Sequence, residues 1–312
     1  GTRWAIRHAQ VHGLHDLPGE RRSHAVPTPR GGGIGIAAAG LAALLLLAAT
    51  DDTPIAWLAM AVGLSLVAGI GWWDDHRPLP AWPRLLVHGI AGGLLAVGLR
   101  ALGADWPAVA AGFLLGVGLV NAWNFMDGIN GMAAVQALLV GGALAWVARG
   151  EGMVVGVVLA AASLGFLPSN FPVARVFLGD VGSGAIGYLV AIVVAFASMR
   201  IDLGMRPILL LPLLAMVIDV AMTLVWRIHR RQRWWDAHVD HAFQRWSRRS
   251  GHVTVTIAYG VWTLLASGFM LAWLGGGLGH GYVVALAWSV ISMAVWWWLH
   301  RPRGGRTEGF GA

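Results

Sequence analysis

Apolar runs, each about as long as a membrane crossing, alternate with short polar segments along almost the whole chain. A helix that crosses a bilayer needs about 20 predominantly apolar residues. Ten such runs can be recognised, at residues 34–50, 54–72, 84–100, 106–122, 132–148, 152–168, 183–199, 206–226, 254–275 and 281–300. The pattern predicts an all-α, polytopic integral membrane protein with about ten transmembrane helices. We expect one membrane-embedded domain over residues 1–312, with 1–33 as a loop and 301–312 as a tail.

Composition agrees with this class. Of the 312 residues, 57% are hydrophobic and only 12% are charged, whereas soluble domains carry roughly 25% charged residues. Cysteine is absent, which excludes disulfides, thiolate catalysis and cysteine-bound metals.

Arginine is distributed unevenly between alternate loops. Of the 22 basic residues, all of them Arg, 18 lie in one set of loops and tails. That set comprises residues 1–33, 73–84, 122–131, 169–182, 227–253 and 301–312. The positive-inside rule places this set in the cytoplasm, with both ends of the chain inside. The net charge of +7 therefore reports topology, and we expect no nucleic-acid partner.

The polar motifs lie in or beside the same set of loops. Between Asn121 and Gly131, one carboxylate and three carboxamides follow an apolar run. Uncompensated polar groups in hydrocarbon are costly, so such a cluster usually faces a cavity, an ion or a substrate. The other motif residues on this side are Arg22, His24, Arg30, Asp74, Asp75, Asn170, Asp180, Ser183, His238 and His241.

Each motif also has a plainer interpretation. Asp74 and Asp75 could be a solvated helix end, and Ser183 alone could be a helix N-cap. The glycine-rich residues 29–36 could be a small-residue helix entry or an anion-binding loop. His238 and His241 could be surface histidines. The arginines around them could serve only topology.

Together, the motifs indicate phosphoryl transfer. Asp and Asn oxygens suit Mg²⁺ or Mn²⁺, and a chain without cysteine is less suited to zinc. Arg, His and glycine-rich loops would neutralise phosphates, and catalysis of this kind rests on positioning and charge stabilisation. A site at the inner membrane surface allows one reactant to be a lipid phosphate and the other a cytosolic nucleotide.

The order and spacing of these motifs resemble those of the polyprenyl-phosphate N-acetylhexosamine-1-phosphate transferases, also called glycosyltransferase family 4. This superfamily includes the enzymes that initiate O-antigen and enterobacterial common antigen, and the translocase of peptidoglycan synthesis. The resemblance covers residues 15 to about 250. Within the superfamily, the local sequences around His24 and His238 resemble those of the branch that transfers N-acetylfucosamine, N-acetylquinovosamine or N-acetylglucosamine phosphate. The matching motifs are Arg22-Ser-His24, Pro27-Thr-Pro-Arg-Gly-Gly-Gly33, Asp74-Asp75, Asn121-x-x-Asn124-Phe-Met-Asp127-Gly, Asn170, Phe177-x-Gly-Asp180-x-Gly-Ser183 and His238-x-x-His241.

The resemblance implies a bacterial inner-membrane enzyme whose active site faces the cytoplasm. Its substrates would be a UDP-N-acetylhexosamine and undecaprenyl phosphate, it would release UMP, and a homodimer is compatible with it. Asn124 and Asp180 would be Mg²⁺ ligands, while Asp74, Asp75 and Asp127 would be catalytic. The residues expected to bind substrate are Arg22, His24, Arg30, Asn170, Ser183, His238 and His241.

The chain departs from the family pattern in three places. Asn130 stands where relatives usually carry Asp, which predicts weaker metal affinity. Asp240 stands where a third imidazole is often found, and its charge would repel a diphosphate unless it pairs with Arg or orients a His. One more span usually precedes the first cytoplasmic loop, so we expect a truncated N-terminus and eleven spans in the full protein.

Two other functions compete with the enzyme. A flippase or other transporter of a lipid-linked sugar would share the topology without needing Mg²⁺ or releasing UMP. It would, however, be expected to place polar groups near the midplane. A catalytically silent scaffold would leave the retained carboxylates unexplained.

Overall fold

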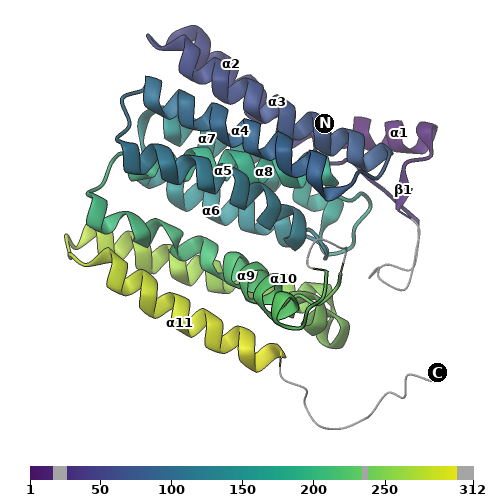
Figure 1. The fold of residues 1–312 in the computed structure, drawn as a ribbon. Helices are drawn as coiled ribbons and strands as arrows, with labels where there is room; N and C mark the ends of the chain where they lie inside the picture. The colour runs from purple at the N-terminus through teal and green to yellow at the C-terminus, as the bar shows by residue number, and fades with distance from the viewer. Residues whose placement is uncertain (17–26, 234–237, 301–312) are drawn as a thin grey trace.

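The protein is a bundle of long, roughly antiparallel helices, seen here in a computed structural model (Figure 1). The structure describes residues 1–16, 27–233 and 238–300, so Arg22 and His24 lie outside the described residues. The elements are α1 (Thr2–His12), β1 (His15–Asp16), β2 (Thr28–Pro29), α2 (Ile34–Thr50), α3 (Pro54–His76), α4 (Ala81–Ala101), α5 (Trp106–Met126), α6 (Met132–Ala148), α7 (Gly150–Asn170), α8 (Asp180–Ser198), the 3₁₀ helix η1 (Leu203–Leu213), α9 (Leu214–His229), α10 (Ala242–Gly275) and α11 (Gly281–His300).

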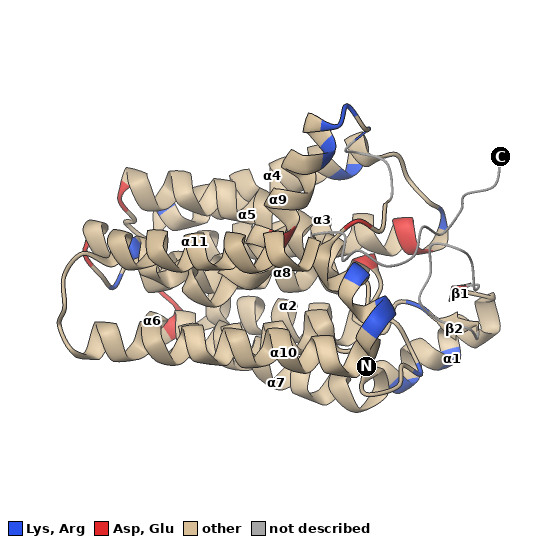
Figure 2. Cartoon of the chain, turned by 90° about the horizontal axis from the view of Figure 1, so that it is seen from below, with Lys and Arg blue, Asp and Glu red and all other residues tan. Residues whose placement is uncertain are grey.

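The helices confirm the all-α membrane class. Within the described part of the chain, eight helical segments are long and apolar enough to cross a membrane, η1 and α9 counting as one segment. Two further apolar helices, α2 and α6, have 17 residues each. Each of these ten segments coincides with one of the ten predicted runs. Charged residues gather at the two ends of the bundle and leave its middle almost free of charge (Figure 2).

Three local features differ from the sequence prediction. The run expected at 206–226 begins as a 3₁₀ helix, because Pro207 and Pro212 lack the N–H that an α-helix needs. The helix expected at 254–275 is preceded by a short helix from Ala242, which a non-helical Gly251 separates from the span. Residues 2–12, expected as loop, form α1 and lie against Trp72 of α3 through Trp4.

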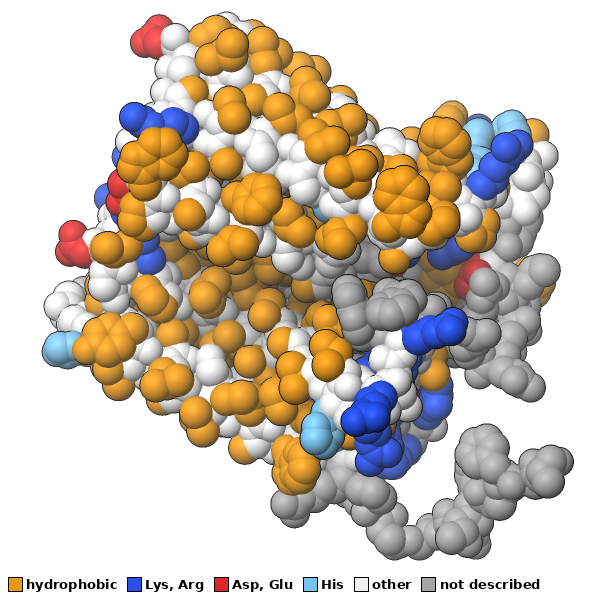
Figure 3. Space-filling view, in the orientation of Figure 1, with side chains coloured by type: hydrophobic (Ala, Val, Ile, Leu, Met, Phe, Trp, Pro, Cys, Tyr) orange, Lys and Arg blue, Asp and Glu red, His pale blue; other side chains and the backbone are white. Residues whose placement is uncertain are grey.

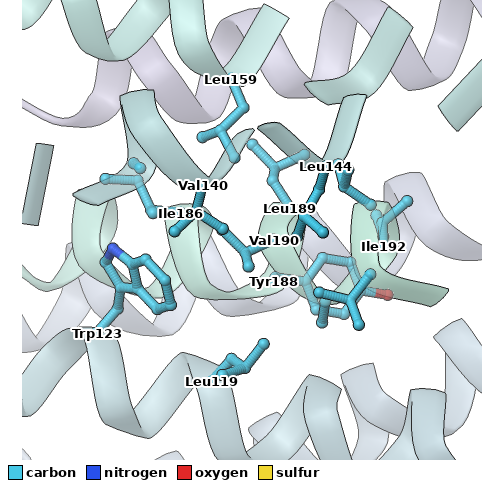
Figure 4. Close-up of a cluster of buried hydrophobic side chains, with 14 of the residues drawn as sticks. Leu119, Trp123, Val140, Leu144, Leu159, Ile186, Tyr188, Leu189, Val190 and Ile192 are labelled. Atoms are coloured by element: carbon cyan, nitrogen blue, oxygen red, sulfur yellow. The ribbon is translucent and has the colours of Figure 1, made fainter. Parts of the chain in front are cut away.

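Helix α8 forms the centre of the bundle. Every residue from Val181 to Ser198 is buried, and its side chains interdigitate with those of α5, α6 and α7 (Figure 4). Gly187 allows the close approach of α5, because a Cβ there would collide with the Leu119 carbonyl oxygen. Apolar side chains cover much of the face of the bundle seen in Figure 3, as a lipid-facing surface requires. The start of α8 is therefore held rigidly at the end that carries the predicted motifs, called here the Arg-rich end.

Candidate active site

The start of α8 is built by two loops that pair with each other. Gly32 N–H donates to the Phe177 carbonyl across 2.9 Å, and Gly33 N–H donates to the Leu178 carbonyl across 2.8 Å. Gly33 also packs against Gly182 so closely that a Cβ on it would overlap the Gly182 Cα. The glycines of the 29–36 motif thus bring Arg30 beside α8.

Asp75 caps α8 from another helix. Its carboxylate accepts the backbone N–H groups of Asp180 and Val181 across 3.0 and 3.2 Å. A helix N-terminus leaves such N–H groups unsatisfied and favours negative charge. Arg30 Nε lies 3.8 Å from the same carboxylate, whose side chain is only 3% exposed. Asp75 therefore satisfies two N–H groups of α8 and also places a negative charge at the N-terminus of this helix.

Arg84 links the carboxylates of Asp74 and Asp180. Its Nη1 lies 2.8 Å from Asp180 Oδ2 and 3.2 Å from Asp74 Oδ2, while Asp74 Oδ1 accepts the Leu79 N–H. Sequence reasoning missed Arg84 as a site residue. The available signal was a charge in the first turn of an otherwise apolar span, which is costly unless it has a partner.

Asp127 completes the acidic group. Burial, together with repulsion from Asp180 and Asp75, raises the pKa of Asp127 to about 8, while Arg30 acts against the shift. The structure thus brings together Arg30, Asp74, Asp75, Asp127 and Asp180 as the motifs predict.

Asn124 and Ser183 lie next to this group and to each other. Asn124 Nδ2 is 3.4 Å from Ser183 Oγ, a long contact between α5 and α8. Ser183 is almost fully buried, and its N–H is bound by the Gly179 carbonyl. Their predicted roles in metal and substrate binding stay predictions.

Asn170 holds two loops together. Its Oδ1 accepts the Gly131 N–H across 2.7 Å and its Nδ2 donates to the Val176 carbonyl across 2.9 Å. Asn130 Nδ2 donates to the Pro172 carbonyl across 3.1 Å. Both amides therefore serve loop structure, whatever further role Asn170 has toward a substrate.

The two predicted histidines form an aromatic cluster on Phe125. The rings of His238 and His241 lie 4.9 Å apart, and the Phe125 ring lies 6.3 and 5.8 Å from them. Gly128 packs against Phe243 in the same region, since a Cβ there would lie 3.1 Å from that ring. The histidine loop and the Asn/Asp motif of residues 121–131 are thus neighbours in space.

Asp240 pairs with Arg227, one of the two alternatives that the sequence left open. Arg227 Nη1 donates to Asp240 Oδ2, and its Nη2 donates to the Arg233 carbonyl across 2.9 Å. The guanidinium therefore offsets the negative charge that would otherwise oppose a diphosphate here.

Asp219 is a second residue that sequence reasoning missed. This carboxylate is 2% exposed and accepts the Ala242 N–H, the Phe243 N–H and the Tyr259 hydroxyl across 2.8, 3.0 and 2.8 Å. His241 Nδ1 lies 3.7 Å from it. The sequence did contain a signal for Asp219, because it is an acidic residue inside the apolar run 206–226. Asp219 fixes both the start of α10 and the position of His241.

The acidic group suits a hard divalent cation in its chemistry. Carboxylate and carboxamide oxygens are ligands that Mg²⁺ accepts, and a cation would relieve the repulsion that raises the pKa of Asp127. Over the described residues, no three His, Asp or Glu side chains already stand as a ready metal site. Arg84 Nη1 instead holds Asp74 and Asp180 together. A cation bound here would compete with Arg84 for these oxygens.

Fold and site together define an all-α polytopic membrane protein with an acid–arginine cluster at one end. Residues 57–198, which include every carboxylate of that cluster, match the model of glycosyl transferase family 4. This match, which covers just under half of the chain, supports the family resemblance that the motifs carry.

The relatives carry related names. The chain is 32% identical over 206 residues to decaprenyl-phosphate N-acetylglucosaminephosphotransferase of Mycobacterium leprae, covering 56% of this chain and 52% of that protein. It is 29% identical over 239 residues to the probable undecaprenyl-phosphate N-acetylglucosaminyl 1-phosphate transferase of Bacillus subtilis, covering 70% and 66%. It is 32% identical over 196 residues to phospho-N-acetylmuramoyl-pentapeptide-transferase of Thermosynechococcus vestitus, covering 53% and 50%. Against most of these relatives, the chain spans about half of their length.

Proposed function

We propose that this protein transfers N-acetylhexosamine-1-phosphate from a UDP-sugar to undecaprenyl phosphate or another polyprenyl phosphate. The proposal places this step first in the synthesis of O-antigen or a related cell-envelope polysaccharide, at the cytoplasmic face of the bacterial inner membrane. The observation that carries it is the cluster of Asp74, Asp180 and Arg84 at the start of α8. The names of the relatives support both the sugar phosphate and the lipid acceptor.

The reaction that fits the cluster is a displacement at phosphorus. An oxygen of the lipid phosphate attacks the β-phosphorus of the UDP-sugar and forms the new P–O bond. The bond from the β-phosphorus to the bridging oxygen breaks, and UMP leaves with that electron pair. Direct attack requires less of the residues than an intermediate on an Asp.

Asp74 and Asp75 differ in exposure and in their hydrogen-bond partners, so we assign them different roles. Asp75 is occupied in capping α8, with a side chain that is 3% exposed, while the Asp74 side chain is 14% exposed. Asp74 is therefore the better placed of the pair to position the acceptor phosphate. Arg84 and Arg30 would bind phosphate oxygens, since guanidinium groups match their geometry.

Asp180 and Asn124 would hold Mg²⁺, with Asp127 beside them. When bound, the cation would neutralise the negative charge that develops on the diphosphate. His238 and His241, whose rings lie against Phe125, would face the nucleotide-sugar.

The test uses the full chain in detergent with undecaprenyl phosphate, Mg²⁺ and a panel of UDP-N-acetylhexosamines, assayed for UMP. We expect UMP with at least one sugar. Asp180→Asn should lower the rate by at least about 100-fold, because it removes a charge at the reacting phosphates. The fold should survive, because Asp75 caps the backbone of residue 180 and not its side chain.

Asp105→Asn is the matched control, since Asp105 lies at the opposite end of the bundle, where it pairs with Arg206. It should leave the rate within about twofold of the parent rate. Absence of UMP with every sugar, together with lipid-linked sugar transport in vesicles, would replace the enzyme by a flippase.

A further inference from the structure

A cavity of about 180 Å³ lies between α9, α10 and α11, apart from the acidic cluster. Its walls are mostly apolar, with Ile218 from α9, Ala258 from α10 and Val295 from α11. It exists because α11 packs mainly along η1 and α9 and touches α10 less.

The cavity borders the lipid-facing surface. Val295 in its wall is 39% exposed, and Val290 and Leu286 on the same helix are 53% and 65% exposed. In a bilayer, this surface contacts hydrocarbon chains. An apolar chain can therefore reach the cavity without crossing a polar barrier.

Trp246, Trp296 and Leu299 in the cavity wall lie toward the Arg-rich end of the bundle. Trp296 in the wall stacks on His300 with ring centroids 4.2 Å apart, and His300 meets Trp226 at 5.1 Å. The Arg230 guanidinium lies 4.5 Å above the Trp226 ring. Such tryptophans are typical of the level of lipid headgroups.

A second arginine approaches from α10. Trp246, which lines the cavity, follows Arg245 on the short helix before the break at Gly251. Burial, together with repulsion from Arg249, Arg248 and Arg230, lowers the pKa of Arg245, so positive charges repel one another at this end of the bundle. A phosphate between these guanidinium groups would relieve that repulsion.

We propose that the cavity between α9, α10 and α11 binds one acyl chain of an anionic bilayer phospholipid, with its phosphate at Arg230 and Arg245. This lipid differs from the acceptor. The charges that act on the pKa of Arg245 include those of Asp240, Arg249, Arg248 and Arg230, whereas Asp74 and Asp180 pair with Arg84. A phosphate held there would be away from the proposed reaction centre. The inference concerns binding alone and stands apart from the proposed activity.

The lipid would also support the histidine loop. Asp219 and Tyr259 line the cavity, and their hydrogen bond belongs to the set that holds the start of α10. A chain that fills the cavity would stabilise this wall, so bound lipid should raise the unfolding temperature.

The experiment titrates the purified full chain in mild detergent with phosphatidylglycerol or phosphatidylcholine and counts bound lipids by native mass spectrometry. We expect one phosphatidylglycerol to be retained preferentially. Ala258→Phe should fill the cavity and reduce that retention by at least about fivefold, equivalent to roughly 1 kcal/mol of binding free energy. Arg230→Gln with Arg245→Gln should abolish the preference for phosphatidylglycerol over phosphatidylcholine.

Ala161→Phe is the matched control, because Ala161 is exposed on α7, which does not line the cavity. Ala215→Leu, from the opposite wall, gives a second filling variant in case Ala258→Phe fails to fold. Equal retention by the parent and both filling variants would overturn the proposal. So would undecaprenyl phosphate displacing phosphatidylglycerol from the parent but not from Ala258→Phe, since the cavity would then belong to the acceptor.

Discussion

Arg84 donates from Nη1 to Asp180 Oδ2 across 2.8 Å, which links the first turn of α4 to the first residue of α8. The same nitrogen lies 3.2 Å from Asp74. One guanidinium therefore holds Asp74 together with Asp180, which is a proposed ligand of the divalent cation.

Arg84→Gln should tighten cation binding. Without the guanidinium, Asp74 and Asp180 repel each other in the metal-free protein, and a cation gains by relieving that repulsion. We expect the Mg²⁺ concentration for half of the thermal stabilisation to fall about tenfold, or roughly 1.4 kcal/mol. Arg206→Gln, at the opposite end of the bundle, is the control. An unchanged Mg²⁺ dependence would show that Arg84 does not compete with the cation.

Asp75→Ala should destabilise the protein more than Asp74→Ala does. Asp75 satisfies two N–H groups of α8 and pairs with Arg30, and loss of a helix cap costs about 0.5–2 kcal/mol. Asp74 satisfies only one backbone N–H, that of Leu79, and also accepts from Arg84. Thermal unfolding in detergent compares the two variants, and the reverse order would contradict the capping role.

Gly71→Ala should impair both folding and activity. A Cβ at Gly71 would lie 2.5 Å from the backbone of Asp180, so α3 could not approach α8 and Asp74 would move away from Asp180. Overpacking of this kind costs about 1–3 kcal/mol. Gly69→Ala on the same helix meets nothing within 4 Å and should be neutral or slightly stabilising. Unfolding temperatures and UMP release test the pair, and equal behaviour would reject the close-approach argument.

Asp219→Asn should raise the KM for the UDP-sugar and lower stability. The carboxylate accepts three strong hydrogen bonds and lies beside His241, and hydrogen bonds to a charged group contribute about 1.5–3 kcal/mol each. Tyr259→Phe removes one donor and leaves both backbone amides bound, so its effect on KM should be small. A fall in stability without a change in KM would assign Asp219 to structure alone.

Acidification from pH 7 to 5 should destabilise the protein partly through His238. Burial, together with the nearby His241 and Arg227, lowers the pKa of His238 to about 4, whereas an unfolded His titrates near 6.5. Between these values only the unfolded state takes up the proton, so stability present above pH 6.5 is lost as the pH falls toward 4.

His238→Gln should flatten that pH dependence of the unfolding temperature. His229→Gln, which changes an exposed histidine at the end of α9, should leave it as in the parent. Identical pH profiles for the parent and His238→Gln would contradict a neutral, buried His238.

The sequence by itself determined the membrane class, the ten apolar segments and the identity of most cluster residues. Hydrophobic length and Arg asymmetry are local properties, and a carboxylate in an apolar run is conspicuous wherever the chain later takes it. The motifs around Asp75, Asp127 and Asp180 could therefore be recognised before their meeting was known.

Only the tertiary structure decided the partners of these residues. Asp74 and Asp75 are neighbours in sequence, yet one shares Arg84 with Asp180 and the other caps α8. Asp219 contacts the histidine loop across more than twenty residues of chain. Such pairings depend on how closely helices approach, which the glycines at 33, 71 and 182 set through the absence of a side chain. The pattern of hydrophobic residues along the chain does not predict how closely two helices approach each other.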